Sequence, residues 1–313
     1  MPGSRWTADD LPDLSSKKIV VTGGNSGIGY EAALQFARKG AYTVLACRSM
    51  EKARGAAAQI TSVYPKASVD VMELDLSSLA SVRAFADRFR SQHNQLHVLC
   101  NNAGVMALPY GRTKDGFEMQ FGTNHLGHFA LTGLLLDRLL AAEGARVVTV
   151  SSGAHRAGSI HFDDLQWEHG YRKWMAYGQS KLANLLFTLE LQRRIETVGA
   201  KLLAVACHPG YAATNLQAAG ARMQGSSMME WFWGMMNSLS AQSGAMGALP
   251  TLYAAAAADV HGGDYIGPDG LGEFWGYPRK VNRSARARDA EVAKRLWSIS
   301  EQLTDVHYNA LGR

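Results

Sequence analysis

Residues 18–29 read KIVVTGGNSGIG, a short apolar run that ends in a glycine-rich turn. The run has the composition of a buried strand, and a helical pattern follows the turn directly. Glycine at these positions allows a tight turn, a close approach of the backbone to a pyrophosphate and close helix–strand contact, and the helix start supplies free N–H groups. This order of elements predicts a dinucleotide site. Its expected residues are Gly23, Asn25, Ser26, Gly27, Ile28 and Gly29.

The alternation of strand and helix continues along the chain. Apolar runs predict further strands at 43–47, 69–74, 98–101, 146–151, 201–207 and near Tyr265. Helical patterns predict helices at about 27–39, 50–63, 79–92, 121–142, 175–198, 248–258 and 288–303. Near-continuous apolar strands between helices are typical of a parallel sheet covered on both faces. We therefore expect one α/β domain over residues 1–313, a doubly wound Rossmann fold whose parallel sheet has about seven strands and helices on both faces.

The composition is that of an ordinary globular enzyme. The 313 residues, 47% of them hydrophobic, suffice for a large buried core. The formal net charge is +5, but the one basic run lacks interleaved aromatic residues, so we interpret it as a solvated loop or helix face and expect no nucleic-acid partner. This run comprises Arg279, Lys280, Arg283, Arg286 and Arg288.

The three cysteines and the chain start bear on location. Cys47, Cys100 and Cys207 each lie in or beside an apolar run, and no pair has the spacing of a disulfide or a zinc site. The sequence does not begin with a signal pattern, and no stretch reaches about 18 uninterrupted apolar residues. We expect reduced thiols in a cytoplasmic protein without a membrane span.

The residues that follow the second and third predicted strands indicate the type of dinucleotide. An acidic residue after the second strand would bind the ribose hydroxyls of NAD, whereas an arginine pairs with the 2′-phosphate of NADP. Arg48 stands there with no acid beside it, so NADP(H) is favoured over NAD. Asp75 follows the third strand, where it would bond the adenine amino group or cap the next helix.

Tyr177 and Lys181 lie four residues apart in YGQSK, on one face of a predicted helix. A tyrosine normally ionises near pH 10, so it transfers protons poorly at neutral pH unless a nearby cation lowers its pKa. Lys181 and a positively charged nicotinamide ring would both act in that direction. Chance also produces this spacing in many helices, so its weight depends on the other motifs.

Six ordered motifs together resemble the short-chain dehydrogenase/reductase family over nearly the whole chain. They are TGGNSGIG, the run 101–104, Asn124, Ser151-Ser152, the pair Tyr177 and Lys181, and Pro209-Gly210 with Thr214. The resemblance implies a catalytic tetrad of Asn124, Ser152, Tyr177 and Lys181. It also implies cofactor contacts from Asp75, Leu76, Asn102, Ala103, Gly104, Tyr177, Lys181, Pro209, Gly210 and Thr214.

The same resemblance implies a role for each tetrad member. Tyr177 would donate a proton to the substrate carbonyl oxygen, and Ser152 would hold that oxygen by a hydrogen bond. Lys181 would bind the nicotinamide ribose and lower the pKa of the tyrosine, and Asn124 would hold a water that relays protons.

The spacing between Ser152 and Tyr177 is wide because of an aromatic insertion, HFDDLQWEHGYRKWM at 161–175. This insertion is similar to the branch of retinol dehydrogenases, WW-domain oxidoreductases and protochlorophyllide reductases, which implies a bulky apolar substrate. A Met- and Trp-rich stretch at 223–236 falls within a segment, about 211–243, that we expect to cover the substrate, although a cluster of this kind also suits core or an oligomer contact.

The main hypothesis is an NADP(H)-dependent oxidoreductase acting on an aldehyde, ketone or secondary alcohol of medium to large apolar character. Reduction of a conjugated C=C bond on the same scaffold is one alternative, and a non-catalytic NADP-sensing protein is another. His125 and His128 share a helix face without a third ligand in sight, so no metal site is expected. The family resemblance implies a homodimer or homotetramer.

Overall fold

The computed structural model describes residues 5–211 and 243–312 of the chain. Its centre is an eight-stranded sheet with the strand order β3-β2-β1-β4-β5-β6-β7-β8. The strands are β1 (Lys18–Thr22), β2 (Tyr42–Cys47), β3 (Val69–Glu73), β4 (Val98–Asn101), β5 (Arg146–Val150), β6 (Leu203–Cys207), β7 (Tyr265–Pro268) and β8 (Pro278–Lys280). Neighbours from β3 through β7 pair in parallel, and β8 pairs antiparallel with β7. The predicted Rossmann-type α/β fold is confirmed, with one antiparallel edge strand that the sequence analysis did not predict.

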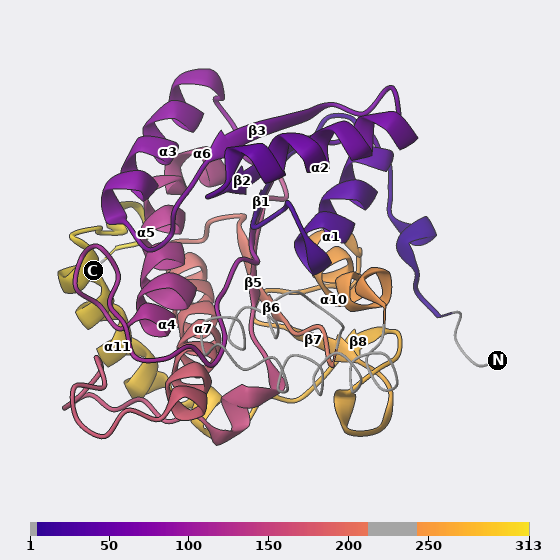
Figure 1. Cartoon of the computed structure of the whole chain (residues 1–313). Helices are drawn as coiled ribbons and strands as arrows, with labels where there is room; N and C mark the ends of the chain where they lie inside the picture. The colour runs from indigo at the N-terminus through magenta and orange to yellow at the C-terminus, as the bar shows by residue number, and fades with distance from the viewer. Residues whose placement is uncertain (1–4, 212–242, 313) are drawn as a thin grey trace.

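Helices cover both faces of this sheet (Figure 1). On one face lie α1 (Gly27–Arg38), α2 (Met50–Val63) and α10 (Gly244–Ala256), which share a core with Ile19 and Val21 of β1. On the other lie α3 (Leu79–Gln92), α5 (Gly127–Leu134), α6 (Leu136–Leu140) and α7 (Lys173–Thr197), whose core includes Val20 and extends to α11 (Ala290–Thr304). Alternate residues of β1 thus enter opposite cores, as expected for a strand buried on both faces.

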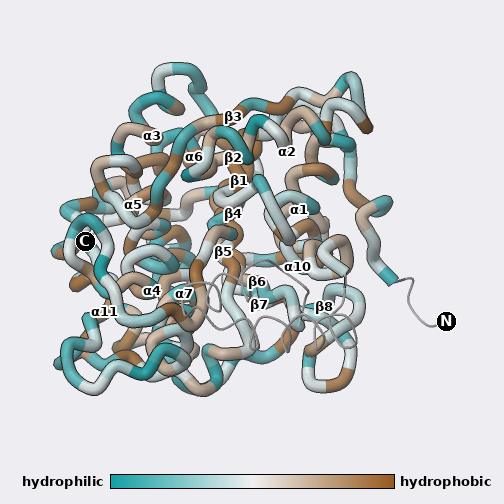
Figure 2. The backbone as a smooth tube through the Cα atoms, in the orientation of Figure 1, coloured by the Kyte–Doolittle hydropathy of each residue, from teal (hydrophilic) through white to brown (hydrophobic). Residues whose placement is uncertain are grey.

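The hydropathy of the backbone follows this layering. Figure 2 shows hydrophobic residues concentrated along the central strands, with hydrophilic residues on the outer turns of the helices. The expected helix periodicity is therefore the outcome of burying one stripe of each helix against the sheet. No helix within residues 5–211 and 243–312 combines the length and apolarity needed to cross a membrane.

The strand order places a crevice beside β1. From β1 the chain proceeds to β2 and β3 on one side, and after α3 it returns to β4 on the other side of β1. The connections from β1 and from β4 run to opposite sides of the sheet, so this point is the topological switch point of the fold. Ligands of open α/β sheets bind at such a switch point, and the glycine turn and the run 101–104 both lie there.

The prediction of one continuous helix at 121–142 is wrong. It is divided into α4 (Met119–Phe121), a π-helical turn (Gly122–Leu126), α5 and α6. The amide of Gly127 donates to the carbonyl of Gly122, five residues earlier, which defines the π turn. A Cβ at Gly127 would lie 2.5 Å from the carbonyl oxygen of Leu76, so the helix approaches the loop after β3 more closely than a side chain allows.

Two further expectations concern the remaining segments. The expected substrate-covering segment, including the Met and Trp residues of 223–236, falls almost entirely within 212–242, outside the described residues. The basic run does not form a single loop or helix face: Arg279 and Lys280 belong to β8, and Arg286 and Arg288 bound a short 3₁₀ turn.

Candidate active site

The glycine turn lies at the carboxyl end of β1, against the loop that follows β4. A side chain at Gly29 would place its Cβ 2.5 Å from the carbonyl oxygen of Gly23 and against the amide of Asn102, so this position requires glycine. Ser26 occupies the N-cap of α1, but its side chain makes no capping hydrogen bond. Since the first amides of an α-helix have no intrahelical partner, they stay available to an anion. The turn fits the pyrophosphate of a dinucleotide.

Thr22 joins this turn to the run 101–104. Its hydroxyl oxygen accepts hydrogen bonds from the amides of Asn102 and Ala103, both at 2.9 Å. The side-chain amide of Asn102 donates back to the Thr22 carbonyl at 2.8 Å. His128 Nε2 lies 2.9 Å from the same hydroxyl, and burial lowers the pKa of His128 to about 4, so the ring is neutral at pH 7. These bonds hold the expected cofactor residues Asn102 and Ala103 on the expected dinucleotide site.

Arg48 is exposed directly after β2. The residue before it, Cys47, is buried, and the backbone amides of Gly24 and Asn25 donate to its thiol, while burial raises its pKa to about 11. The Asn25 amide therefore contacts the end of β2. No hydrogen bond or ion pair of Arg48 is found with the described part of the chain, so its guanidinium can meet a phosphate from solvent.

Asp75 and Leu76 follow β3 in the same region. The Asp75 carboxylate accepts from the amide and hydroxyl of Ser77 at 3.0 and 2.7 Å, and Lys114 Nζ lies 3.2 Å away. Burial raises the pKa of Asp75, but these partners outweigh it and the pKa lies below its ordinary value. The alternative of a helix cap is wrong, because Ser78 caps α3. Leu76 is buried.

Tyr177 and Lys181 lie on the first turns of α7, and both side chains are almost fully buried, with 5% and 3% exposed. Lys181 Nζ lies 5.7 Å from the centre of the Tyr177 ring and donates to the carbonyl of Val150 at 3.1 Å. Burial raises the pKa of Tyr177 to about 12, which a hydrogen bond with Ser152 partly opposes, and burial lowers the pKa of Lys181 to about 8. The Tyr177 hydroxyl is therefore protonated at neutral pH. The expected lowering of the Tyr177 pKa by Lys181 is not seen: burial raises this pKa, and Ser152 is the group that opposes the rise.

The two serines after β5 have different partners. Ser151 is buried and its hydroxyl donates to the carbonyl of Lys181 at 2.8 Å, which ties β5 to α7. Ser152 is partly exposed and accepts from the amide of Ala154 at 3.2 Å, and its hydroxyl is near enough to Tyr177 to oppose the rise in the pKa of that tyrosine. Ser152 is therefore the serine that faces the tyrosine, as its expected role requires.

Asn124 is fully buried within the π turn and connects two parts of the site. Its side-chain oxygen accepts from the amide of Val105 at 2.8 Å, and its side-chain amide donates at 2.9 Å to the Val105 carbonyl and to the Ser180 hydroxyl. Both amide protons are thus used within the protein. A Cβ at Gly104 would lie 3.1 Å from Asn124 Oδ1 and 3.5 Å from Lys181 Nζ, so glycine lets these side chains approach the loop after β4.

The expected carboxamide-binding segment begins where β6 ends. Gly210 has a φ of 67° and its amide hydrogen-bonds His208 Nδ1 at 3.3 Å. His208 Nε2 lies 3.1 Å from Glu273 in the loop after β7, a partner that sequence analysis missed. Pro209 lies between these residues, whereas Thr214 lies outside the described residues.

Gln120 is a second residue that sequence analysis missed. It is fully buried, accepts from the amide of Ala107 at 2.7 Å, and donates to the Tyr171 hydroxyl and the Lys173 carbonyl, both at 2.9 Å. It thereby joins the loop after β4 to the aromatic insertion. No signal in the sequence revealed it, because Gln120 stands just before the helix predicted at 121–142 and its partners are far away along the chain.

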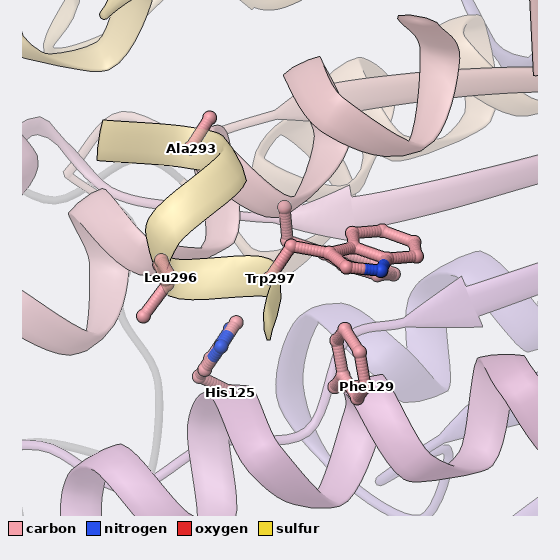
Figure 3. A pocket seen from close by; sticks show the side chains of 6 residues that line it. His125, Phe129, Ala293, Leu296 and Trp297 are labelled. Carbon is pink, nitrogen blue, oxygen red and sulfur yellow. The ribbon is translucent and has the colours of Figure 1, made fainter. Parts of the chain in front are cut away.

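His125 belongs to a packed cluster. Its Nε2 lies 2.9 Å from the Ser300 hydroxyl, and burial lowers its pKa to about 3. Figure 3 shows it facing α11, where aromatic and aliphatic side chains enclose it. The enclosing residues are Phe129, Phe187, Ala293, Leu296 and Trp297. Among residues 5–211 and 243–312, no three His, Cys, Asp or Glu side chains are grouped to hold a metal ion.

Comparisons with known proteins identify relatives of this chain. The sequence profile described as short chain dehydrogenase matches residues 17–225. Retinol dehydrogenase 12 of Mus musculus is 41% identical over 295 residues, covering 94% of this chain and 88% of its own. Retinol dehydrogenase 13 of Homo sapiens is 42% identical over 291 residues, covering 93% and 85%.

Solved structures show the same fold. An uncharacterized protein from Mycobacterium Paratuberculosis is 45% identical, with a TM-score of 0.81 over 97% of this chain and 99% of its own. A short chain dehydrogenase from Shigella flexneri 2A, solved in complex with NADP, is 23% identical, with a TM-score of 0.62 over 82% and 98%. At that identity the second structure supports the fold alone.

Proposed function

Because the chain belongs to the short-chain dehydrogenase family, in its retinol dehydrogenase-like branch, it is an oxidoreductase, and we propose that it interconverts a carbonyl and an alcohol with NADP(H). The proposed substrate is an aldehyde, ketone or secondary alcohol of medium to large apolar character. The observation that carries the proposal is the buried Tyr177, which has Lys181 Nζ 5.7 Å from its ring centre and the Ser152 hydroxyl near enough to lower its pKa.

Tyr177 acts as the proton donor when a carbonyl is reduced. Since burial keeps its hydroxyl protonated at neutral pH, the group can donate to a carbonyl oxygen, and Ser152 shares that oxygen by a second hydrogen bond. The nicotinamide, when bound, supplies the hydride that reduces the carbonyl carbon. Lys181, charged below about pH 8, stabilises the negative charge that develops on Tyr177 as the proton leaves.

The residues that would hold the dinucleotide fit it in three places. The glycine turn and the uncapped start of α1 suit the pyrophosphate. Lys181, which approaches Gly104 closely, would bind the nicotinamide ribose. Arg48 suits the 2′-phosphate of NADP, and the buried thiol of Cys47 takes the place where an acid would favour NAD.

Asn124 has a positioning role in this proposal. Because both of its amide protons are used by Val105 and Ser180, its side chain braces the loop after β4 against α7. A water that relays protons would therefore have to bind to Asn124 through a group other than its side-chain N–H protons.

Support for an apolar substrate comes from the aromatic insertion beside the site and from the names of the relatives, which act on retinol. We also infer a cytoplasmic location, since Cys47, Cys100 and Cys207 are free and buried. A homodimer or homotetramer stays a proposal from the family resemblance.

The experiment is a substrate panel with the purified full chain. Aldehydes, ketones, steroids and secondary alcohols are incubated with NADPH or NADP⁺, and nicotinamide absorbance is followed. We expect turnover of apolar carbonyl compounds with NADPH. Saturation of an enone at its C=C bond would instead favour the conjugated-bond reductase, and NADPH binding without any turnover would favour the sensor.

A further inference from the structure

Trp174 is a large aromatic side chain that stays exposed beside the catalytic tyrosine. It belongs to the first turn of α7, three residues before Tyr177, and 49% of it is accessible to solvent. The two rings are 6.4 Å apart, centre to centre, and nearly perpendicular at 81°. Tyr177 thus contacts one side of the indole, and about half of the Trp174 side chain stays uncovered by residues 5–211 and 243–312.

The backbone that carries Trp174 is held firmly. Gln120, itself fully buried, donates to the carbonyl of Lys173 and to the hydroxyl of Tyr171. The Tyr171 hydroxyl in turn donates to the carbonyl of Leu108 at 2.9 Å. These bonds fix the chain on the N-terminal side of Trp174, so its exposed indole starts from a rigid base and not from a free loop.

Tyr177 has a closed side and an open side along α7. Lys181, one turn later, is buried against Val150 and beside Gly104, where the proposed cofactor site lies. Trp174, one turn earlier, is exposed. A carbonyl oxygen that accepts a hydrogen bond from Tyr177 must lie about 2.5–3.0 Å from its hydroxyl. A group attached to that carbonyl on the exposed side of Tyr177 would lie beside the indole, whose ring centre is 6.4 Å from that of Tyr177.

We propose that Trp174 determines substrate specificity by packing its indole against an aromatic ring attached to the reacting carbonyl. Aromatic pairs at this distance prefer offset-stacked or edge-to-face contact, which a saturated ring of similar size does not offer. The inference rests on the proposed function, because it names a substrate class for the same site. The preferred substrates are aryl aldehydes and aryl ketones.

The test compares matched pairs of substrates that differ only in saturation. Benzaldehyde is compared with cyclohexanecarbaldehyde, and 2-naphthaldehyde with its decahydro analogue, as kcat/KM at saturating NADPH. In Trp174→Leu we expect the aromatic-to-saturated ratio to fall about 3- to 10-fold, which is the usual worth of one aromatic pair. Trp174→Phe should keep most of the ratio, since it retains a ring.

Trp275→Leu is the matched control, because Trp275 is also 49% exposed but stacks on Phe274 in the loop after β7. It should leave the ratio unchanged. An unchanged ratio in Trp174→Leu, or an equal fall for aromatic and saturated substrates, would overturn the proposal. Circular dichroism of each variant verifies that the fold is retained.

A binding measurement separates this proposal from the proposed function. Calorimetric titration with 2-naphthalenemethanol and its decahydro analogue, in the presence of NADPH, needs no turnover. If the wild-type chain reduced no aldehyde, the proposed function would fail, yet the binding ratio would still decide the role of Trp174. We expect the preference for the aromatic alcohol to shrink 3- to 10-fold in Trp174→Leu, and an unchanged preference would contradict it.

Discussion

Replacing Arg48 by alanine tests the proposed preference for NADP(H). A charge-assisted hydrogen bond contributes about 1.5–3 kcal/mol, and because Arg48 is exposed we take the lower end, about 1.5–2 kcal/mol. That range corresponds to a roughly 10- to 30-fold rise in the Kd of NADPH. The Kd of NADH, which lacks the 2′-phosphate, should change by less than about twofold. Both values are measured by titrating nicotinamide fluorescence at low salt, and the difference should shrink as salt is added.

Arg54→Ala is the control for that experiment. Arg54 is also exposed and lies in α2, the helix that follows Arg48, so its removal lowers the net charge equally. It should leave the ratio of the two dissociation constants unchanged. An equal loss of NADPH and NADH affinity in Arg48→Ala, or the same shift in Arg54→Ala, would refute the assignment of Arg48 to the 2′-phosphate.

Two other predictions concern the proton-transfer groups. Ser152→Ala should lower kcat about 10²-fold or more in a steady-state assay. Ser151→Ala loses the hydrogen bond to the Lys181 carbonyl, so it should mainly lower the melting temperature. The reverse pattern would exchange the roles of the two serines. Because the pKa of Lys181 is about 8, its positive charge is present below that pH and lost above it, so the rate of carbonyl reduction should decline as pH rises through about 8. A pH profile that stays flat from 7 to 9.5 would contradict the role of its charge.

Most of the fold could be predicted because its signals are local. Apart from β3 at the sheet edge, the parallel strands are buried apolar runs, and the glycine turn marks where the first strand meets its helix. β8 could not be predicted, since its three residues, Pro278–Lys280, have too little apolar pattern and two of them are exposed at the sheet edge. The π turn at Gly122–Leu126 could not be predicted either, because an apolar helical period does not reveal where one backbone bond runs to the fifth residue and not the fourth.

Some residues of the candidate site could likewise be predicted from the sequence, and others could not. Tyr177 and Lys181 were predictable because one helix turn brings them to a common face. The choice between Ser151 and Ser152 rested on resemblance, and their separate hydrogen bonds supply a physical reason for it. Gln120 could not be found from the sequence, because its partners lie more than ten residues away in both directions and meet it only in the folded chain.

The most direct test of the central claim is the turnover of Tyr177→Phe, which removes only the hydroxyl that donates the proton. We predict that this variant binds NADPH with a Kd within about twofold of wild type and that its kcat falls about 10²- to 10⁴-fold. Tyr308→Phe is the control: it also loses a buried hydroxyl, which donates to the Phe129 carbonyl at 2.7 Å, so its stability should fall while its kcat stays near that of wild type. Turnover by Tyr177→Phe at the wild-type rate would contradict the assignment of Tyr177 as the proton donor.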